Sequence, residues 1–364
     1  MKESITKKRI LLAPLDWGLG HTTRCIPLIR HFKNQGHDVV VAAEGIAAQL
    51  LKENFPEITI VELQGYRIDY SNSQWGFSLK ILSQIPKILK AIKSEHQFLE
   101  NYLSNHYFDL IVSDNRYGFF SSKVKSVILT HQVQILSGKG KLLDSILRKI
   151  HKKKLEKFDE CWIVDGSEAP GLSGILGHPA QLPKNYKYIG YLSQFDNQKL
   201  QIGAAQPNHI LILLSGPEPM RSMLALKLWK QCQKLTEYSF IFVSGNPNAR
   251  PPDHIPAHIE WYSHLSQNKL FEAFENAEMV ICRSGYTTLM DLMTLKRPAL
   301  LIPTPGQTEQ EYLAQHLSQS SNVFMMMPQN QLNLRLAIES FKRKKDTTYS
   351  FFKTQNNFRE IIET

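Results

Sequence analysis

The sequence predicts an α/β protein made of two doubly wound, Rossmann-like domains that face each other across a cleft. Short, nearly continuous aliphatic runs alternate with helix-length segments along the chain, as is typical of parallel strands buried on both faces. This pattern restarts after residue 208. The 364 residues are enough for two domains with separate cores.

The aliphatic runs of the first half predict a parallel sheet. They span residues 9–13, 38–42, 58–61, 109–112, 126–129 and 161–164. Helical patterns between them imply right-handed βαβ connections.

The second half repeats the pattern after a polar stretch at 193–208. Its strand-like runs span residues 210–214, 240–243, 259–261, 280–282 and 299–302. We place the first domain at residues 1–198, the second at 199–345, and a C-terminal helix that packs back on the first domain at 346–364. Domains of this kind bind ligands beyond the carboxyl ends of their strands, so the segments that follow strands are candidate sites.

Composition indicates a basic globular protein with a net charge of +10 and 42% apolar residues. A basic surface suits nucleic acid, anionic lipid or a phosphorylated small molecule. The polar first residues lack the apolar core of a signal peptide, and no apolar run reaches the roughly 20 residues of a membrane-spanning helix. The four cysteines are far apart, without a Cys-x-x-Cys pair, which is typical of a reducing compartment. We therefore expect a cytoplasmic protein.

The first predicted strand leads into a segment that contains Gly18, Gly20 and His21. Glycines let the backbone turn tightly and approach a ligand. The helix expected at 25–34 would present unpaired N–H groups at its start, and a histidine there can act as a base near neutral pH. An ordinary strand-to-helix turn with an exposed capping histidine is the alternative, because such short motifs are common.

Residues 18–28 resemble the glycine-rich first loop of glycosyltransferase family 28. The second half resembles the donor-binding signature of the same family in order and spacing. The matching positions are 282–285, 288, 291–292, 298–303, 309–310 and 314. The resemblance implies the GT-B fold and an inverting transfer of a sugar from a uridine diphosphate sugar, such as UDP-N-acetylglucosamine, to a hydroxyl of a lipid-linked or envelope-glycan acceptor.

The resemblance also implies where the donor binds on the second domain. Ser284 and Gly285 would open a helix that holds the diphosphate without metal, and Asp291 stands where the family has a glutamate that binds the ribose. Glu309 and Gln310 would contact the sugar. The complete set of expected donor-binding residues is Gly20, Ser215, Gly216, Arg221, Ser244, Tyr262, Ser263, Arg283, Ser284, Gly285, Thr288, Asp291, Glu309 and Gln310. We expect neither a metal nor a cofactor.

The loop at 215–221 departs from the usual family pattern. It contains two prolines around Glu218, and prolines remove backbone donors. A carboxylate that faces a diphosphate is unfavourable unless a cation such as Arg221 compensates. We therefore expect Glu218 to face the sugar or the acceptor. Ser244 ends another strand of this domain and is equally compatible with a plain turn.

Two polar segments end strands of the first domain and are expected on the acceptor side. Asp114 follows one strand, and it either orients His21 as the catalytic base or serves as an alternative base. His131 and Gln132 follow the next strand. Helix capping by Asp114 and a hydrogen-bonded loop role for His131 remain the alternatives. The expected acceptor-binding residues are Gly18, Thr22, His131 and Gln132.

Two amphipathic segments combine apolar and basic residues. They lie at 75–93 and at 142–150, the second within a lysine-rich stretch at 139–157. Basic amphipathic helices are typical of membrane surfaces, although a helix packed on its own core gives the same pattern. We expect peripheral contact with the anionic inner face of a membrane.

Three other functions compete with this interpretation. A UDP-sugar hydrolase or epimerase would use the same donor site without a separate acceptor. A nucleic-acid-binding protein would use the lysine-rich stretch, but the sequence has no RNA-binding motif beside it. A non-catalytic sugar-nucleotide-binding subunit would bind the donor and leave His21 unused. We expect no nucleic-acid partner.

Overall fold

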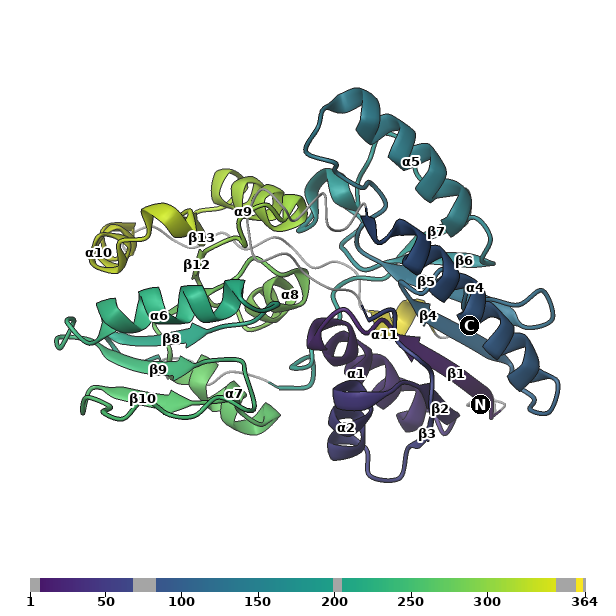
Figure 1. The fold of residues 1–364 in the computed structure, drawn as a ribbon, viewed down its shortest axis with the longest axis horizontal. Helices are drawn as coiled ribbons and strands as arrows, with labels where there is room; N and C mark the ends of the chain where they lie inside the picture. Colours follow the sequence, from purple (N-terminus) through teal and green to yellow (C-terminus); the bar gives the residue numbers. More distant parts are fainter. Residues whose placement is uncertain (1–6, 68–82, 199–204, 345–357, 363–364) are drawn as a thin grey trace. The chain divides into compact units, whose positions relative to one another are not determined.

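The computed structural model describes residues 7–67, 83–198, 205–344 and 358–362. These residues form two compact units. Unit 1 holds 7–67, 83–194 and 358–362, and unit 2 holds 195–198 and 205–344. Each unit contains one parallel sheet (Figure 1). The prediction of two doubly wound α/β domains is therefore confirmed.

The sheet of unit 1 has the strand order β3-β2-β1-β4-β5-β6-β7. Its strands are β1 (Arg9–Pro14), β2 (Asp38–Ala42), β3 (Thr59–Val61), β4 (Leu110–Asp114), β5 (Lys125–Thr130), β6 (Glu160–Ile163) and β7 (Tyr186–Tyr188). The six predicted strands of this half all form. The edge strand β7 was missed because its sequence, Tyr-Lys-Tyr, has no aliphatic run.

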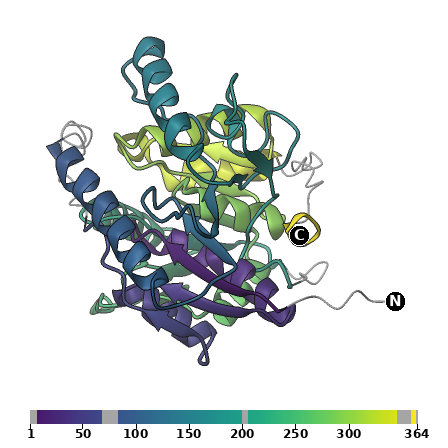
Figure 2. The ribbon, with the colours of Figure 1, turned by 90° about the vertical axis from the view of Figure 1, so that its right-hand side faces the viewer.

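The helices of unit 1 connect these parallel strands. They are α1 (Leu19–Asn34), α2 (Gly45–Asn54), α4 (Ile85–Leu103), α5 (Lys141–Leu155) and the short α11 (Phe358–Ile361). In two perpendicular views, α5 lies toward one end of the sheet and α2 toward the other (Figures 1 and 2). The ring of Phe358 packs 5.6 Å from that of His31 on α1, so α11 packs against α1.

The start of α1 differs from the expectation. The helix was expected from residue 25 but begins at Leu19, after Gly18 with φ +87° and ψ 168°. An L side chain rarely adopts this positive φ, so glycine permits the abrupt change from strand to helix. The earlier start places His21 in the first turn and Arg24 on the same face, three residues later.

The register of β1 and β4 determines which loops of unit 1 meet. Pro14 at the end of β1 lies opposite Asp114 at the end of β4. Successive strands are added outward from β1 on one side and from β4 on the other, so these two strands form the switch point of the sheet. The polar segments that follow them therefore lie together at the carboxyl edge.

Unit 2 repeats the arrangement with the order β10-β9-β8-β11-β12-β13. Its strands are β8 (His209–Leu213), β9 (Ser239–Val243), β10 (Ile259–Tyr262), β11 (Met279–Cys282), β12 (Ala299–Leu301) and β13 (Phe324–Met326). Its helices are α6 (Met220–Cys232), α7 (Gln267–Asn276), α8 (Tyr286–Thr294), α9 (Thr308–Ser320) and α10 (Leu334–Lys344). The switch point lies between β8 and β11. The edge strand β13 was missed because it is short and rich in methionine.

The first predicted amphipathic segment is only partly described, and the second is described throughout. The part of the first at 75–82 lies outside the described residues, and the remainder forms the beginning of α4. The second forms most of α5. No helix in the described ranges is long and apolar enough to cross a membrane.

Candidate functional site

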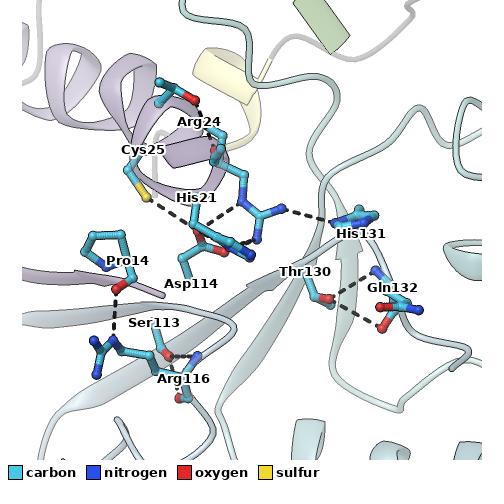
Figure 3. A network of polar contacts seen from close by, with 12 residues as sticks. Pro14, His21, Arg24, Cys25, Ser113, Asp114, Arg116, Thr130, His131 and Gln132 are labelled. Atoms are coloured by element: carbon cyan, nitrogen blue, oxygen red, sulfur yellow. Dashed lines mark hydrogen bonds and ion pairs between the residues drawn. The ribbon is translucent and has the colours of Figure 1, made fainter. Parts of the chain in front are cut away.

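His21 and Asp114 form a side-chain pair at the switch point of unit 1. His21 lies in the first turn of α1, and Asp114 is the last residue of β4. The imidazole Nδ1 is 3.0 Å from the carboxylate Oδ2 (Figure 3). Asp114 is fully buried, whereas 17% of the His21 side chain is exposed. The pair thus combines an accessible imidazole with a buried acid.

Arg24 completes a buried charged cluster around this pair. Its Nε donates to Asp114 Oδ2 at 3.0 Å, and its Nη2 donates to the other carboxylate oxygen. The same guanidinium lies 2.8 Å from His21 Nδ1 and 3.1 Å from the Nδ1 of His131. Arg24 is not among the predicted site residues, because a helix that begins at residue 25 leaves the direction of its side chain undefined.

The electrostatics of the cluster keep the carboxylate ionised. Burial alone would raise the pKa of Asp114, but the charges and hydrogen bonds of Arg24 and His21 outweigh burial and lower this pKa to about 2. Burial, followed by the Arg24 charge, lowers the pKa of His21, and the Asp114 carboxylate only partly opposes them. His21 is therefore neutral, and Asp114 charged, at neutral pH.

A second buried network fixes the strand ends beneath this cluster. The Arg116 side chain donates through Nε to the carbonyl of Pro14 at 2.9 Å and through Nη1 to Glu95 of α4 at 3.3 Å. Glu95 also accepts from the Tyr66 hydroxyl at 2.7 Å and the Gly118 N–H at 2.6 Å. These contacts join the ends of β1 and β4 to α4, which limits movement of the loops that carry His21 and Asp114.

The expected acceptor-side residues occupy different environments. Gly18 caps α1, and the Thr22 side chain is fully buried one residue beyond His21. His131 follows β5 and is brought into the charged cluster by its contact with Arg24. Gln132 is half-buried, and its N–H donates to Thr130 Oγ1 at 3.1 Å.

The expected donor-binding residues of unit 2 gather along the carboxyl edge of its sheet. They lie at the ends of the five neighbouring strands β10, β9, β8, β11 and β12, in the loops after them or in the helices that follow. Ser284 after β11 donates through Oγ to the carbonyl of Gln310 on α9 at 2.7 Å. Gln310 in turn accepts the Thr304 N–H at 2.9 Å through its side chain. The start of α8 and the start of α9 are thus tied together.

Arg283 acts as an internal tie between loops of unit 2. Its guanidinium is 1% exposed. It donates to the carbonyls of Ile302, Pro303 and Met220 at 3.1, 3.0 and 2.8 Å. Burial lowers the pKa of Arg283 to about 10. The side chain joins the segments that follow β8, β11 and β12.

Arg221 and Glu218 pair with each other in the loop that follows β8. Arg221 Nη2 is 2.7 Å from Glu218 Oε1, and its Nη1 donates to the carbonyl of Gly245 after β9 at 2.5 Å. Gly245 has φ +69°, and a Cβ there would lie 2.0 Å from the carbonyl oxygen of Leu214. Arg221 therefore forms a direct ion pair with Glu218, as expected of the cation that compensates this carboxylate.

The remaining expected donor residues of unit 2 lie at the same edge, whereas Gly20 lies at the start of α1 in unit 1. Ser244 Oγ donates to the carbonyl of Ser263 at 3.1 Å, and the hydroxyl of Tyr262 donates to Glu260 at 2.9 Å. Asp291 on α8 is 4% exposed. Ser215 and Gly216 are exposed, and Gly20, Gly285, Thr288 and Glu309 are half-buried. Across the described part of the chain, no three His, Cys, Asp or Glu side chains come together as a metal site.

Comparisons with known proteins agree with this organisation. Residues 226–364 match the glycosyltransferase family 28 C-terminal domain, and residues 8–136 match glycosyl transferase family 1. An uncharacterized glycosyltransferase of Methanosarcina acetivorans is 25% identical over 326 residues, which cover 83% of this chain and 79% of that protein. The UDP-N-acetylglucosamine–N-acetylmuramyl-(pentapeptide) pyrophosphoryl-undecaprenol N-acetylglucosamine transferase of Buchnera aphidicola is 22% identical over 357 residues, which cover 94% and 91%.

Solved structures share the fold at low sequence identity. CalG4, the calicheamicin glycosyltransferase, has a TM-score of 0.64 at 13% identity, with coverage of 94% of this chain and 91% of that one. Acinetobacter baumannii MurG has a TM-score of 0.54 at 15% identity, with the same coverage of both chains.

The fold and the matched domains together define the class of the protein, which is a glycosyltransferase of the GT-B fold. Within this class it resembles glycosyltransferase family 28, as both the C-terminal match and the Buchnera relative indicate.

The Asp114 carboxylate should make acid stability depend on pH. Its folded-state pKa of about 2 lies below the value of about 3.9 expected in an unfolded chain. Its stabilisation of the folded state, roughly 2–3 kcal/mol, is therefore complete above about pH 5 and is lost as the pH falls through 2. Urea unfolding at stepped pH should show a shallower decline for Asp114→Asn than for wild type. Glu57→Gln, at an exposed position, is the matched control. Equal declines of stability in wild type and Asp114→Asn would contradict the low pKa of Asp114.

Proposed function

We propose that the protein transfers a sugar, with inversion, from a uridine diphosphate sugar to a hydroxyl of a lipid-linked or envelope-glycan acceptor. The observation that carries the proposal is the His21–Asp114 pair at the switch point of unit 1. The donor loops at the equivalent edge of unit 2 support it. The Buchnera relative is named as a transferase of N-acetylglucosamine from UDP-N-acetylglucosamine to a lipid-linked acceptor, which favours this donor and acceptor class.

In the proposed mechanism, His21 is the general base. Its imidazole removes the proton of the acceptor hydroxyl, the oxygen attacks the anomeric carbon, and the nucleoside diphosphate leaves from the opposite face. Asp114 orients the ring through Nδ1, as carboxylates do in other histidine dyads. Its low pKa makes Asp114 itself a weak base at neutral pH, so orientation is the role we assign to it.

The two helix starts of unit 2 suit different parts of the donor. The first turn of α8, capped by Gly285, has no acidic residue, so its N–H groups and positive dipole end suit the diphosphate. The first turn of α9 contains Glu309 and Glu311, which would repel phosphate but can accept hydrogen bonds from sugar hydroxyls. We therefore assign the diphosphate to α8 and the sugar to α9.

His21→Gln should lower kcat for transfer by roughly 10²–10⁴-fold, because it removes the base and keeps the size of the side chain. The measurement is acceptor-dependent release of UDP, with thermal unfolding as a check on folding. His106→Gln replaces an exposed histidine of the same unit and should leave the rate unchanged. Equal UDP release with and without acceptor would instead identify a UDP-sugar hydrolase, and full activity of His21→Gln would refute the proposed base.

Arg221→Met should weaken the binding of UDP by about tenfold, the equivalent of about 1.4 kcal/mol. The substitution removes the cation that pairs with Glu218 at the end of the loop after β8. The negative charge of Glu218 would then repel the bound diphosphate. The measurement is the UDP concentration that raises the unfolding temperature. Arg343→Met on α10 is the matched control, and an unchanged response of Arg221→Met would exclude a donor role for Arg221.

We also propose that an anionic membrane binds the outer faces of α4 and α5. Six apolar side chains of these helices are 37–80% exposed, namely Leu142, Leu143, Ile146 and Ile150 on α5 and Ile85 and Leu89 on α4. Exposed lysines such as Lys149 and Lys153 lie among them. Both helices contact the segment 117–120, through Tyr117 and His151 on one side and through Phe120 and His96 on the other. Charge complementarity therefore favours an anionic lipid surface.

Replacing Leu142 and Ile146 together with serine should reduce sedimentation with phosphatidylglycerol vesicles several-fold, because it removes the apolar surface that enters the interface. Lys149→Glu with Lys153→Glu should do the same, at about 1 kcal/mol per lysine, whereas neutral phosphatidylcholine vesicles should bind weakly throughout. The control replaces Leu226 and Leu336, exposed leucines of unit 2. Binding that survives both α5 variants would refute the proposed surface.

A further inference from the structure

Arg24 is a buried cation beside the proposed base. It is 1% exposed and faces groups from three elements, namely His21 on its own helix, Asp114 at the end of β4 and His131 after β5 (Figure 3). A buried guanidinium is unfavourable unless it is well paired. Its pairing partner here is the same carboxylate that contacts the imidazole of His21.

The guanidinium fixes the orientation of that carboxylate. Both oxygens of Asp114 accept hydrogen bonds from Arg24, in the two-point geometry that arginine favours. Oδ2 lies 3.0 Å from Arg24 Nε and also 3.0 Å from His21 Nδ1. Asp114 therefore cannot turn away from His21 without losing its contacts with Arg24.

We propose that Arg24 is a positioning residue of the transfer reaction, which holds Asp114 against His21 and keeps the imidazole unprotonated, as a base must be. This inference rests on the proposed role of His21 as the base. Arg24 itself is buried beneath the exposed edge of the imidazole, so it acts through the two side chains and not on the substrate.

The charges around His21 explain how Arg24 disfavours the imidazolium. The guanidinium Nη2 lies 2.8 Å from Nδ1, and the positive charge opposes protonation of the ring. Asp114 favours protonation, His131 is a second titratable ring near the guanidinium, and the thiol of Cys25 reaches the same carboxylate at 3.8 Å. Arg24 and Asp114 cancel, so protonation of either histidine would place a net positive charge in a buried cluster.

The contacts at Nδ1 also bear on the tautomer of His21. A neutral imidazole nitrogen either donates to Asp114 or accepts from Arg24, and Nδ1 is within hydrogen-bonding distance of both. When Nδ1–H donates to Asp114, Nε2 carries the lone pair that takes the proton of the acceptor. An ionised carboxylate selects this tautomer, and Arg24 keeps Asp114 ionised.

The decisive experiment is an NMR titration of ¹⁵N-labelled histidines in the full chain, with His21→Gln used to assign the signal. We expect a pKa for His21 below the usual value of about 6.5 in the wild type and an increase of about one unit in Arg24→Gln. The acid limb of the kcat/KM profile should move to higher pH by the same amount, because the base must be unprotonated. Arg24→Lys keeps the charge and should restore the wild-type limb, and Arg30→Gln on the same helix is the matched control.

A wild-type pKa of His21 above 7 would overturn the proposal, as would a folded Arg24→Gln with an unchanged pKa. If Arg24→Gln does not fold in a thermal unfolding test, the titrations of wild type and Arg24→Lys decide. Both should then show a neutral His21 at pH 6.5 and above with the proton on Nδ1, and a proton on Nε2 would overturn the proposal. The titration needs no donor or acceptor, so it tests the role of Arg24 separately from the proposed function. The proposed role of His21 as the base fails only if His21→Gln retains transfer activity.

Discussion

The parallel register of β1 and β4 is the constraint on which the site of unit 1 depends. Because Pro14 and Asp114 are opposed at the ends of these strands, the start of α1 faces the end of β4. The same topology at β8 and β11 brings the loop before α6 next to the start of α8. In each unit, residues about 70 to 100 positions apart in sequence become neighbours through a single strand pairing. The chemistry therefore follows from strand order more than from any local motif.

The charged groups at these edges are stabilised in two different ways. In unit 1, Arg24 is paired with a buried carboxylate, so its charge remains coupled to the proposed base. In unit 2, Arg283 is buried and donates to three main-chain carbonyls. Removing a partner from such a buried site leaves an uncompensated charge. The first arrangement can tune a proton transfer, whereas the second can only hold loops in place.

The sequence was sufficient for the fold and for the placement of most candidate residues. Aliphatic runs located the central strands because buried parallel strands have a strong and continuous signal. Edge strands β7 and β13 were not predicted, since three residues with one apolar face carry little pattern. The cluster around His21 was only half predicted. The cation of this cluster, Arg24, was not predicted, because its place depends on a helix start set by the positive φ of Gly18. Helix propensities do not predict that conformation.

The contacts of the residues that resemble the donor-binding signature of family 28 indicate a structural role for several of them. Arg283, Ser284 and Gln310 direct their side chains to the main chain of neighbouring loops, so these positions encode the shape of the edge. Their side chains have little capacity left for a ligand. The groups that such a framework presents are the N–H groups at the start of α8 and the side chains in the first turn of α9. A string of residues that shapes this framework is compatible with many sugars, because the choice of sugar then depends on side chains outside the string.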